Sequence, residues 1–178
     1  GYYFGSIVAP SGTAAPNGGA VGLLIREDHS AVLLGHERIP DVRDDTRFPE
    51  HTRIYVARNV FFDDTGAFNF EATSYIPNPF FSPTVPQLIT SRISVRGSIT
   101  DSGALSGRLN ESSTFSASRS ADDGVTAVFA GFYAAMEAGS SYEVLAMAGP
   151  AGQIYAVRQK NGGIDAGAGT LNPNGTVS

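Results

Sequence analysis

The sequence has no cysteine, a single lysine (Lys160) and no long apolar run. Without cysteine, the chain can form neither a disulfide nor a thiolate metal site. Its apolar runs are too short for a membrane-spanning helix, which needs about 20 apolar residues. Basic residues are outnumbered, 12 against 17 acidic residues, and the net charge is −5. Because nucleic-acid binding depends on a basic face that releases counterions, we expect no nucleic-acid partner.

The chain is instead rich in glycine, with 21 residues, and in serine and threonine. Its 178 residues are the length of one domain, which can bury roughly two thirds of its unfolded surface. We therefore expect a single β-domain over residues 1–178 that folds without covalent crosslinks. The chain begins at Gly1-Tyr2 with no methionine, so we also expect a processed or excised product.

Alternation of apolar and polar residues with a period of two dominates the sequence and predicts strands with one buried face. In three stretches the apolar positions are Ile93, Val95, Gly97 and Ile99; then Leu105, Gly107 and Leu109; then Phe115 and Ala117. This pattern is typical of antiparallel sheets.

Tight-turn signals that combine Asp or Asn with Gly separate these stretches. They are Asp63–Gly66, Asp101–Gly103, Asp122–Gly124, Gly149–Gly152, Asn161–Gly163 and Asn172–Gly175. The sequence therefore predicts an all-β fold, an antiparallel up-and-down meander that forms a closed or nearly closed β-barrel, since closure removes exposed edges. A two-sheet β-sandwich is the second choice.

The segment 122–139 can be interpreted in two ways. Its aspartates, alanines and closing glycine would suit a helix. A strand is favoured because the chain starts again here: GFYAAM at 131–136 is similar to GYYFGS at 1–6. Two further pairs of segments align, 22–34 with 144–157 and 63–70 with 172–178. These similarities predict an internal pseudo-repeat with units 1–130 and 131–178.

In this alignment the second unit stops part-way, which bears on the terminal stretch Gly175–Ser178. An unfinished sheet leaves unpaired backbone groups that attract another strand. We expect the stretch to close the barrel against the N-terminal strands of its own chain. The alternative is pairing with a neighbouring copy of the chain.

Two short motifs, Asp64-Thr65-Gly66-Ala67 and Asp101-Ser102-Gly103-Ala104, match the core of the aspartic proteases. In such an enzyme the two carboxylates share a proton, and each follows a buried apolar strand end. Here Asp63 and Thr100 precede the two motifs, and only a hairpin or two separates them. We therefore expect Asp64 and Asp101 to be exposed turn residues, and no enzyme activity.

All three histidines, His29, His36 and His51, lie close together in the sequence among several acidic residues. No histidine pair has the spacing of a metal site, and interleaved arginines would repel a cation. The pairs Asp63-Asp64 and Asp122-Asp123 could hold calcium, but two acids supply too few ligands. We expect surface turns and paired charges at these positions, with no metal and no cofactor.

Two long irregular stretches, 38–52 and 74–87, interrupt the meander, and loops of this length are often functional. The second combines Tyr75, Phe80 and Phe81 with four prolines. Aromatic side chains on a stiff loop can contact a sugar or a protein partner. These three are the candidate ligand or partner contacts. The other interpretation, which is slightly favoured, is that they fold back and plug one end of the barrel.

The run GYYFGS…AVGLLIREDHSAVLLG…NVFFDDTGAFNF…ISVRGSITDSGALSGRL…FSASR…AGFY…GPAGQIYAV resembles the glycine-rich β-meander modules of large secreted bacterial surface proteins. The resemblance covers most of the chain. It implies an extracellular or cell-surface location and no obvious catalysis, and it transfers no site residue.

The leading functional hypothesis is a non-enzymatic extracellular structural or adhesion module, one unit of a larger surface assembly. Its partners would be further copies of the chain, joined through edge strands, or neighbouring domains of a larger protein. The alternative is a β-barrel that binds a small apolar ligand or a glycan. A third is a hydrolase whose site the sequence does not reveal.

Overall fold

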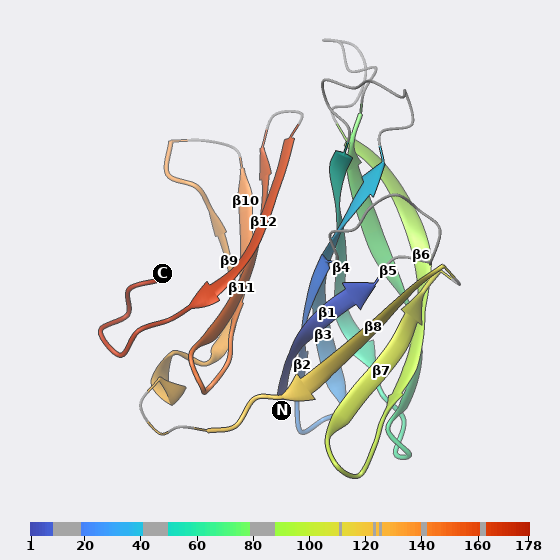
Figure 1. Ribbon diagram of the computed structural model, residues 1–178, viewed down its shortest axis with the longest axis vertical. Coiled ribbons are helices and arrows are strands. Elements are labelled where there is room, and N and C mark those ends of the chain that lie inside the picture. Colours follow the sequence, from blue (N-terminus) through green and yellow to red (C-terminus); the bar gives the residue numbers. More distant parts are fainter. Residues whose placement is uncertain are drawn as a thin grey trace.

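The computed structural model describes residues 1–8, 19–40, 50–78, 88–110, 112–122, 124, 126–139, 142–160 and 163–178. The fold is all-β, with two antiparallel sheets (Figure 1). The first sheet is a closed barrel of eight strands in sequence order, which confirms the predicted meander barrel. Its strands are β1 (Tyr2–Val8), β2 (Gly19–Ile25), β3 (Ser30–Pro40), β4 (Glu50–Phe61), β5 (Ala67–Pro77), β6 (Leu88–Ile99), β7 (Ala104–Leu109) and β8 (Ser113–Arg119).

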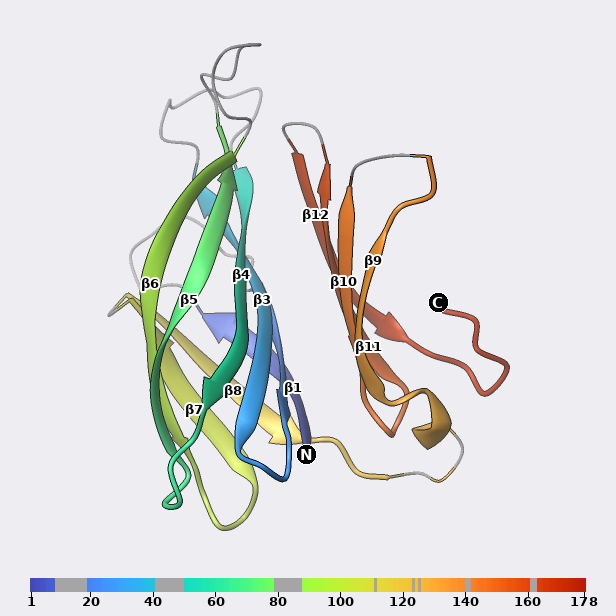
Figure 2. The same cartoon turned by 180° about the vertical axis from the view of Figure 1, so that it is seen from behind.

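The second sheet has four strands in the order β12-β11-β10-β9 and lies against one side of the barrel, as Figures 1 and 2 show from opposite directions. Its strands are β9 (Gly131–Met136), β10 (Glu143–Ala148), β11 (Gln153–Lys160) and β12 (Gly163–Thr170). A single 3-10 turn, Ala127–Phe129, precedes β9. In the part of the chain that the structure describes, no helix is long and apolar enough to cross a membrane.

The inward faces of all eight barrel strands form one apolar core. Period-two alternation places every second residue of a strand on the same face, so each strand contributes two or three side chains. The buried members are Tyr3, Ile7, Val21, Leu23, Ala31, Leu33, Tyr55, Ala57, Phe62, Phe68, Ala72, Ile93, Val95, Leu105, Leu109, Phe115 and Ala117. The interior of the barrel is thus occupied by side chains.

A second apolar core lies between the barrel and the four-stranded sheet. The outward side chains of β2, β3 and β4 meet the inner face of β10, β11 and β12 there. The buried members are Leu24, Val32, Leu34, Ile54, Val56, Leu145, Met147, Tyr155, Val157 and Ile164. Burial of both faces explains why β2, β3 and β4 carry continuous apolar runs, GLLI, AVLLG and IYVA.

Residues 122–139 contain a strand, as the pseudo-repeat favoured, but it begins only at Gly131. The residues just before it form the 3-10 turn, so the segment has no α-helix among its described residues. The expectation that the terminal stretch closes the barrel is wrong. Strand β8 pairs with β1 and closes the barrel, whereas Val177 forms a bridge with Leu171 next to its own strand β12. The short segment turns back on β12 because the Asn172–Gly175 turn reverses the chain directly before it.

Glycine permits the close approach of β1 and β8 at the seam where the barrel closes. Gly5 lies opposite Ala117, and a Cβ atom at Gly5 would lie 1.8 Å from the carbonyl oxygen of Ser116. That oxygen belongs to the backbone, so it can move only if the strand moves. Gly167 in β12 provides a contrast, because a Cβ atom there would meet nothing within 4 Å.

We predict that Gly5→Ala lowers the free energy of unfolding by about 2 kcal/mol or more, because overpacking forces a backbone shift. Gly167→Ala is the matched control and should be neutral or slightly stabilising, since alanine restricts the unfolded chain. Guanidinium unfolding curves of the three proteins provide the measurement. Equal midpoints for the two variants would contradict the close-approach argument.

Candidate functional site

A buried carboxylate lies inside the barrel, next to its apolar core. Glu37 in β3 is inward-facing, and only 4% of its side chain is exposed. The hydroxyl of Tyr55 donates a hydrogen bond to its Oε1, and Ser113 Oγ donates to its Oε2 at 2.8 Å. Arg53, opposite Glu37 in the β3–β4 register, places NH1 3.4 Å from Oε1. Two strands, β4 and β8, therefore supply donors to one carboxylate on β3.

These donors satisfy the strict requirement that a buried charge be paired and hydrogen-bonded. Burial, followed by the adjacent Glu37 carboxylate, raises the pKa of Tyr55 well above its usual range. Tyr55 therefore stays protonated and remains a hydrogen-bond donor at neutral pH. The arrangement ties β3, β4 and the start of β8 together inside the barrel.

Two polar contacts join the barrel to the four-stranded sheet at the edge of the second core. Nδ1 of His36 in β3 and the hydroxyl oxygen of Tyr155 in β11 are 2.7 Å apart, and the two rings are nearly parallel. Burial, followed by the positive charge of Arg38, lowers the pKa of His36. Arg58 in β4 pairs with Glu143 in β10 at 2.8 Å, and its guanidinium lies 5.7 Å from the centre of the Phe132 ring.

A groove runs beside the Arg58–Glu143 ion pair. It is lined by Val56, Arg58, Thr73, Tyr75, Glu143, Leu145 and Gln159, so both sheets contribute to it. Tyr75, one of the three candidate contact residues, is half-buried there and packs against the second core. The other two, Phe80 and Phe81, lie outside the described residues. The structure therefore associates Tyr75 with the junction between barrel and sheet.

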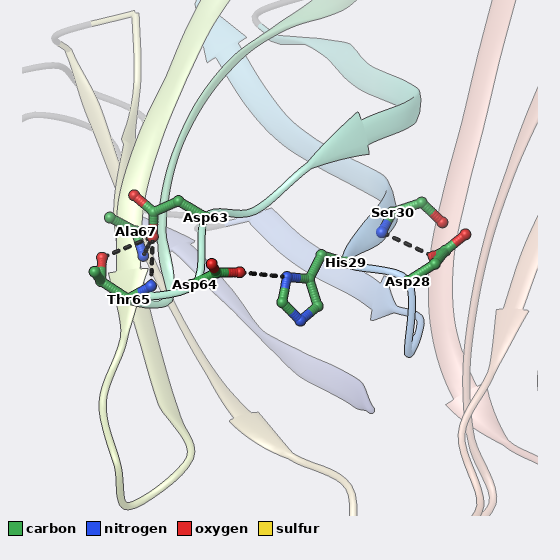
Figure 3. Close-up of polar contacts among 7 residues, drawn as sticks. All are labelled: Asp28, His29, Ser30, Asp63, Asp64, Thr65 and Ala67. Atoms are coloured by element: carbon green, nitrogen blue, oxygen red, sulfur yellow. Dashed lines mark hydrogen bonds and ion pairs between the residues drawn. The ribbon is translucent and has the colours of Figure 1, made fainter.

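The Asp-Thr-Gly motif lies in an exposed turn between β4 and β5 (Figure 3). The carboxylate of Asp63 accepts hydrogen bonds from the Thr65 hydroxyl and from the backbone N–H groups of Thr65 and Ala67. The Thr65 hydroxyl contributes most to lowering the pKa of Asp63. Gly66 takes a φ of +79°, as the turn signal predicted. Asp63 thus has the role of a turn former.

Asp64, the residue equivalent to a protease aspartate, is almost fully exposed, and its Oδ1 lies 3.3 Å from Nδ1 of His29 (Figure 3). His29 belongs to the β2–β3 turn, where Asp28 also accepts a hydrogen bond from the backbone of Ser30. Asp101 is exposed in the separate turn between β6 and β7. Both aspartates are therefore exposed turn residues, as expected.

The three histidines have different surroundings. His29 lies in a turn, His36 contacts Tyr155, and His51 lies opposite Ile39 in the β3–β4 ladder. Among the described residues, no group of three or more His, Asp or Glu side chains could hold a metal ion. Most of the charged stretch between β3 and β4, residues 41–49, lies outside the described part.

Glu37, Tyr55, Ser113 and Arg53 form what we call the Glu37 cluster. The sequence contains a signal for this cluster that the motif-based predictions missed. Glu37 continues the inward positions Ala31, Leu33 and Gly35 of β3. A charge in phase with an apolar face predicts a buried charge that needs a partner. Ser113 could not be inferred in this way, because it lies far away in the sequence and only barrel closure brings β8 close to β3.

No model of a protein family matches the chain, and no curated protein or solved structure matches it.

We predict that Glu37→Leu lowers the free energy of unfolding by about 3 kcal/mol, because it leaves Tyr55, Ser113 and Arg53 without their acceptor. Glu71→Leu is the matched control. The Glu71–Arg92 pair is exposed, and such pairs contribute at most about 1 kcal/mol. Urea unfolding at pH 7 measures both variants. If they lose the same stability, the buried cluster does not stabilise the barrel.

We predict that the chain loses stability as the pH falls below about 6.5, the ordinary pKa of histidine. The folded pKa of His36 is lowered, so the unfolded chain binds the proton more readily than the folded one. This contribution is fully present above the unfolded pKa and decreases until the pH reaches the folded pKa. Its slope is at most about 1.4 kcal/mol per pH unit.

The measurement is chemical unfolding at several pH values between 5 and 8. His36→Gln should reduce the slope below pH 6.5, even if it lowers stability at pH 7. His29→Asn is the control, because His29 lies in an exposed turn at a φ of +63°, which asparagine tolerates. An unchanged slope in His36→Gln would show that His36 is not the titrating group.

Proposed function

We propose that the chain is a non-enzymatic structural or adhesion module of a bacterial cell surface and one unit of a larger assembly. The observation that carries the proposal is the continuous apolar core inside the barrel, to which the inward faces of its strands contribute side chains. A barrel that binds an apolar ligand keeps part of its interior free for it. A barrel filled by its own side chains is instead suited to a rigid structural part.

The coupling between the two sheets supports the same role. Strands β2, β3 and β4 contribute to both apolar cores, so the sheet cannot separate from the barrel without exposing buried apolar surface. The His36–Tyr155 contact and the Arg58–Glu143 ion pair connect the same two parts. Asp64 of the protease-like motif and its neighbour Asp63 lie in an exposed turn.

The extracellular location rests on composition and on the resemblance to secreted surface modules. The chain has no cysteine, a single lysine and 21 glycines. Antibody staining and protease treatment of intact cells that produce the protein test this location. A signal that appears only after lysis would contradict it.

We predict that apolar ligands do not stabilise the folded chain. A ligand that binds only the folded state raises its stability by about 2.7 kcal/mol at a concentration of 100 Kd. Thermal unfolding with increasing oleate or anilinonaphthalene sulfonate should therefore leave the Tm unchanged. A rise in Tm that grows with ligand concentration would overturn the structural role and favour the binding barrel. A panel of soluble oligosaccharides tests the glycan alternative in the same way.

Leu33→Ala is the positive control for this experiment. Leu33 is 1% exposed in the barrel core, and its truncation leaves a dry apolar cavity of the kind that binds small apolar molecules. The variant should have a lower Tm than the unmodified chain and should recover part of the loss with a small probe such as benzene. The unmodified chain should not respond to benzene.

A further inference from the structure

The four-stranded sheet repeats the first four strands of the barrel, in the same order and with the same strand registers. The pairs Tyr3–Leu23 and Gly5–Val21 of β1 and β2 correspond to Tyr133–Ala146 and Ala135–Val144 of β9 and β10. The pairs Leu33–Ala57 and Leu34–Val56 of β3 and β4 correspond to Ala156–Gly167 and Val157–Ala166 of β11 and β12. One difference is a β-bulge in the β3–β4 pair, where Asn59 has a φ of +57°. The β11–β12 register runs without a shift.

The hairpin turns also correspond. In the β2–β3 turn, the N–H of Arg26 donates to Ser30 at 2.8 Å, and His29 has a φ of +63°. In the β10–β11 turn, the N–H of Gly149 donates to Gln153 at 2.7 Å, and Gly152 has a φ of +77°. The residues at equivalent places, His29 and Gly152, each accept a further backbone hydrogen bond, from Phe62 and Leu171 respectively.

The correspondence continues beyond the fourth strand. The N–H of Asp63 donates to Ala67 at 3.0 Å, and Gly66 has a φ of +79°. In the turn after β12, the N–H of Asn172 donates to Thr176 at 2.8 Å, and Gly175 has a φ of +82°. By this alignment Val177 takes the place of Phe68. The rings of Phe68 and Phe62 are in contact in the barrel core. Val177 likewise lies next to Leu171, the counterpart of Phe62, with which it forms a backbone β-bridge.

The two units pack on each other through equivalent faces. Equivalent residues of the second core are Tyr2 and Phe132, Leu24 and Met147, Val32 and Tyr155, Leu34 and Val157, Ile54 and Ile164, and Val56 and Ala166. This is the self-complementary arrangement of a two-fold interface, here within one chain. Because one face of β9–β12 packs on the barrel, its opposite face is the counterpart of the faces of β1–β4 that line the barrel interior.

That outward face has the composition of an interior wall. Its exposed or half-buried apolar members include Tyr133, Ala135, Val144, Ala146, Ile154, Ala156 and Gly167. The charges lie at one end, where Arg158 pairs with Glu137 and Asp165. Arg158 and Asp165 are the counterparts of Gly35 and Tyr55, beside the Glu37 cluster of the barrel. Apolar and polar parts are therefore distributed as they are inside the barrel.

The barrel indicates what covers such a face. There β1–β4 are covered by β5–β8, with β5 antiparallel to β4 and β8 antiparallel to β1. The covering strands point bulky residues inward, among them Phe68, Val95, Leu105 and Phe115. The equivalent edges, β12 and β9, are the outer strands of their sheet. Figures 1 and 2 show the C-terminal end on the side of the sheet that faces away from the barrel.

We propose that β9–β12 is a second copy of the first half of the barrel, and that its outward face and two edges bind a four-stranded antiparallel sheet of the β5–β8 type, which closes a second barrel. The partner carries bulky apolar residues at alternate positions, because the face that it covers is formed mainly by alanine and glycine. The β9–β12 sheet of another copy would oppose alanine to alanine and leave the interior underfilled. The inference does not depend on the proposed function, since a binding module could be completed in the same way.

The test supplies the missing half from the chain itself. Because Thr176–Ser178 corresponds to Ala67–Asn69, a second copy of residues 70–121 is appended directly after Ser178. Hydrogen exchange of the β9 and β12 amides is then compared with that of the original chain. We expect exchange at the free edges to slow by about 100-fold or more, as edge amides become ladder amides. The amides of β1–β8 serve as an internal reference that the first barrel is folded.

Substitutions at Tyr133 and Ala134 test whether the new protection depends on the outward face of the sheet. Tyr133 corresponds to the inward residue Tyr3, and Ala134 is its exposed neighbour on the opposite face. Tyr133→Asp should leave the Tm of the original chain within about 2 °C, as exposed substitutions do. In the extended chain it should abolish the new protection. Ala134→Asp is the matched control and should leave that protection in place.

Two outcomes would overturn the proposal. One is an extended chain whose β9 and β12 amides exchange as fast as those of the original chain, with Tyr133→Asp and Ala134→Asp behaving alike. The other is an original chain that is a dimer in light scattering and whose β9 and β12 amides are already protected from exchange. That result would assign the face to a second copy of the chain.

Discussion

Burial of β2, β3 and β4 on both faces is the constraint on which the rest of the structure depends. Their inward side chains, such as Leu23 and Leu33, belong to the barrel core, and their outward neighbours, such as Leu24 and Leu34, belong to the core under the four-stranded sheet. A strand in this position cannot shift its register by one residue without exchanging the two sets of side chains. The barrel and the sheet therefore fix each other's position through three barrel strands that contribute to both cores.

The polar groups of the described interior follow from the same constraint. Glu37 lies on the inward face of β3, where Tyr55, Ser113 and Arg53 supply the donors that a buried carboxylate needs. His36, the residue before it, points to the other face and meets Tyr155 of the sheet. Adjacent residues of one strand thus form two different contacts, one within the barrel and one between the barrel and the sheet.

The proposed structural role and the proposed second barrel have a common physical basis. A filled barrel with a second, half-complete wall packed on its side is a unit that can be extended by adding strands. Addition of this kind uses backbone groups of an edge and an apolar face already arranged for burial. The equivalence of the two packed faces, with Leu24 facing the same core as Met147, means that a completed pair of barrels would be related by a pseudo-two-fold axis.

The sequence by itself determined the all-β class, the meander order and most turns, because period-two alternation and Asp/Asn-Gly turns are local signals. It also indicated that GFYAAM is a strand, through its similarity to the first residues of the chain. Only the tertiary structure decided which strand closes the barrel, since β1 and β8 are far apart in sequence and their pairing depends on the shape of the whole sheet. The Glu37–Ser113 bond and the division of Leu23 and Leu24 between two cores were likewise decided there. Local patterns specify which face of a strand is apolar, whereas only packing specifies what covers that face.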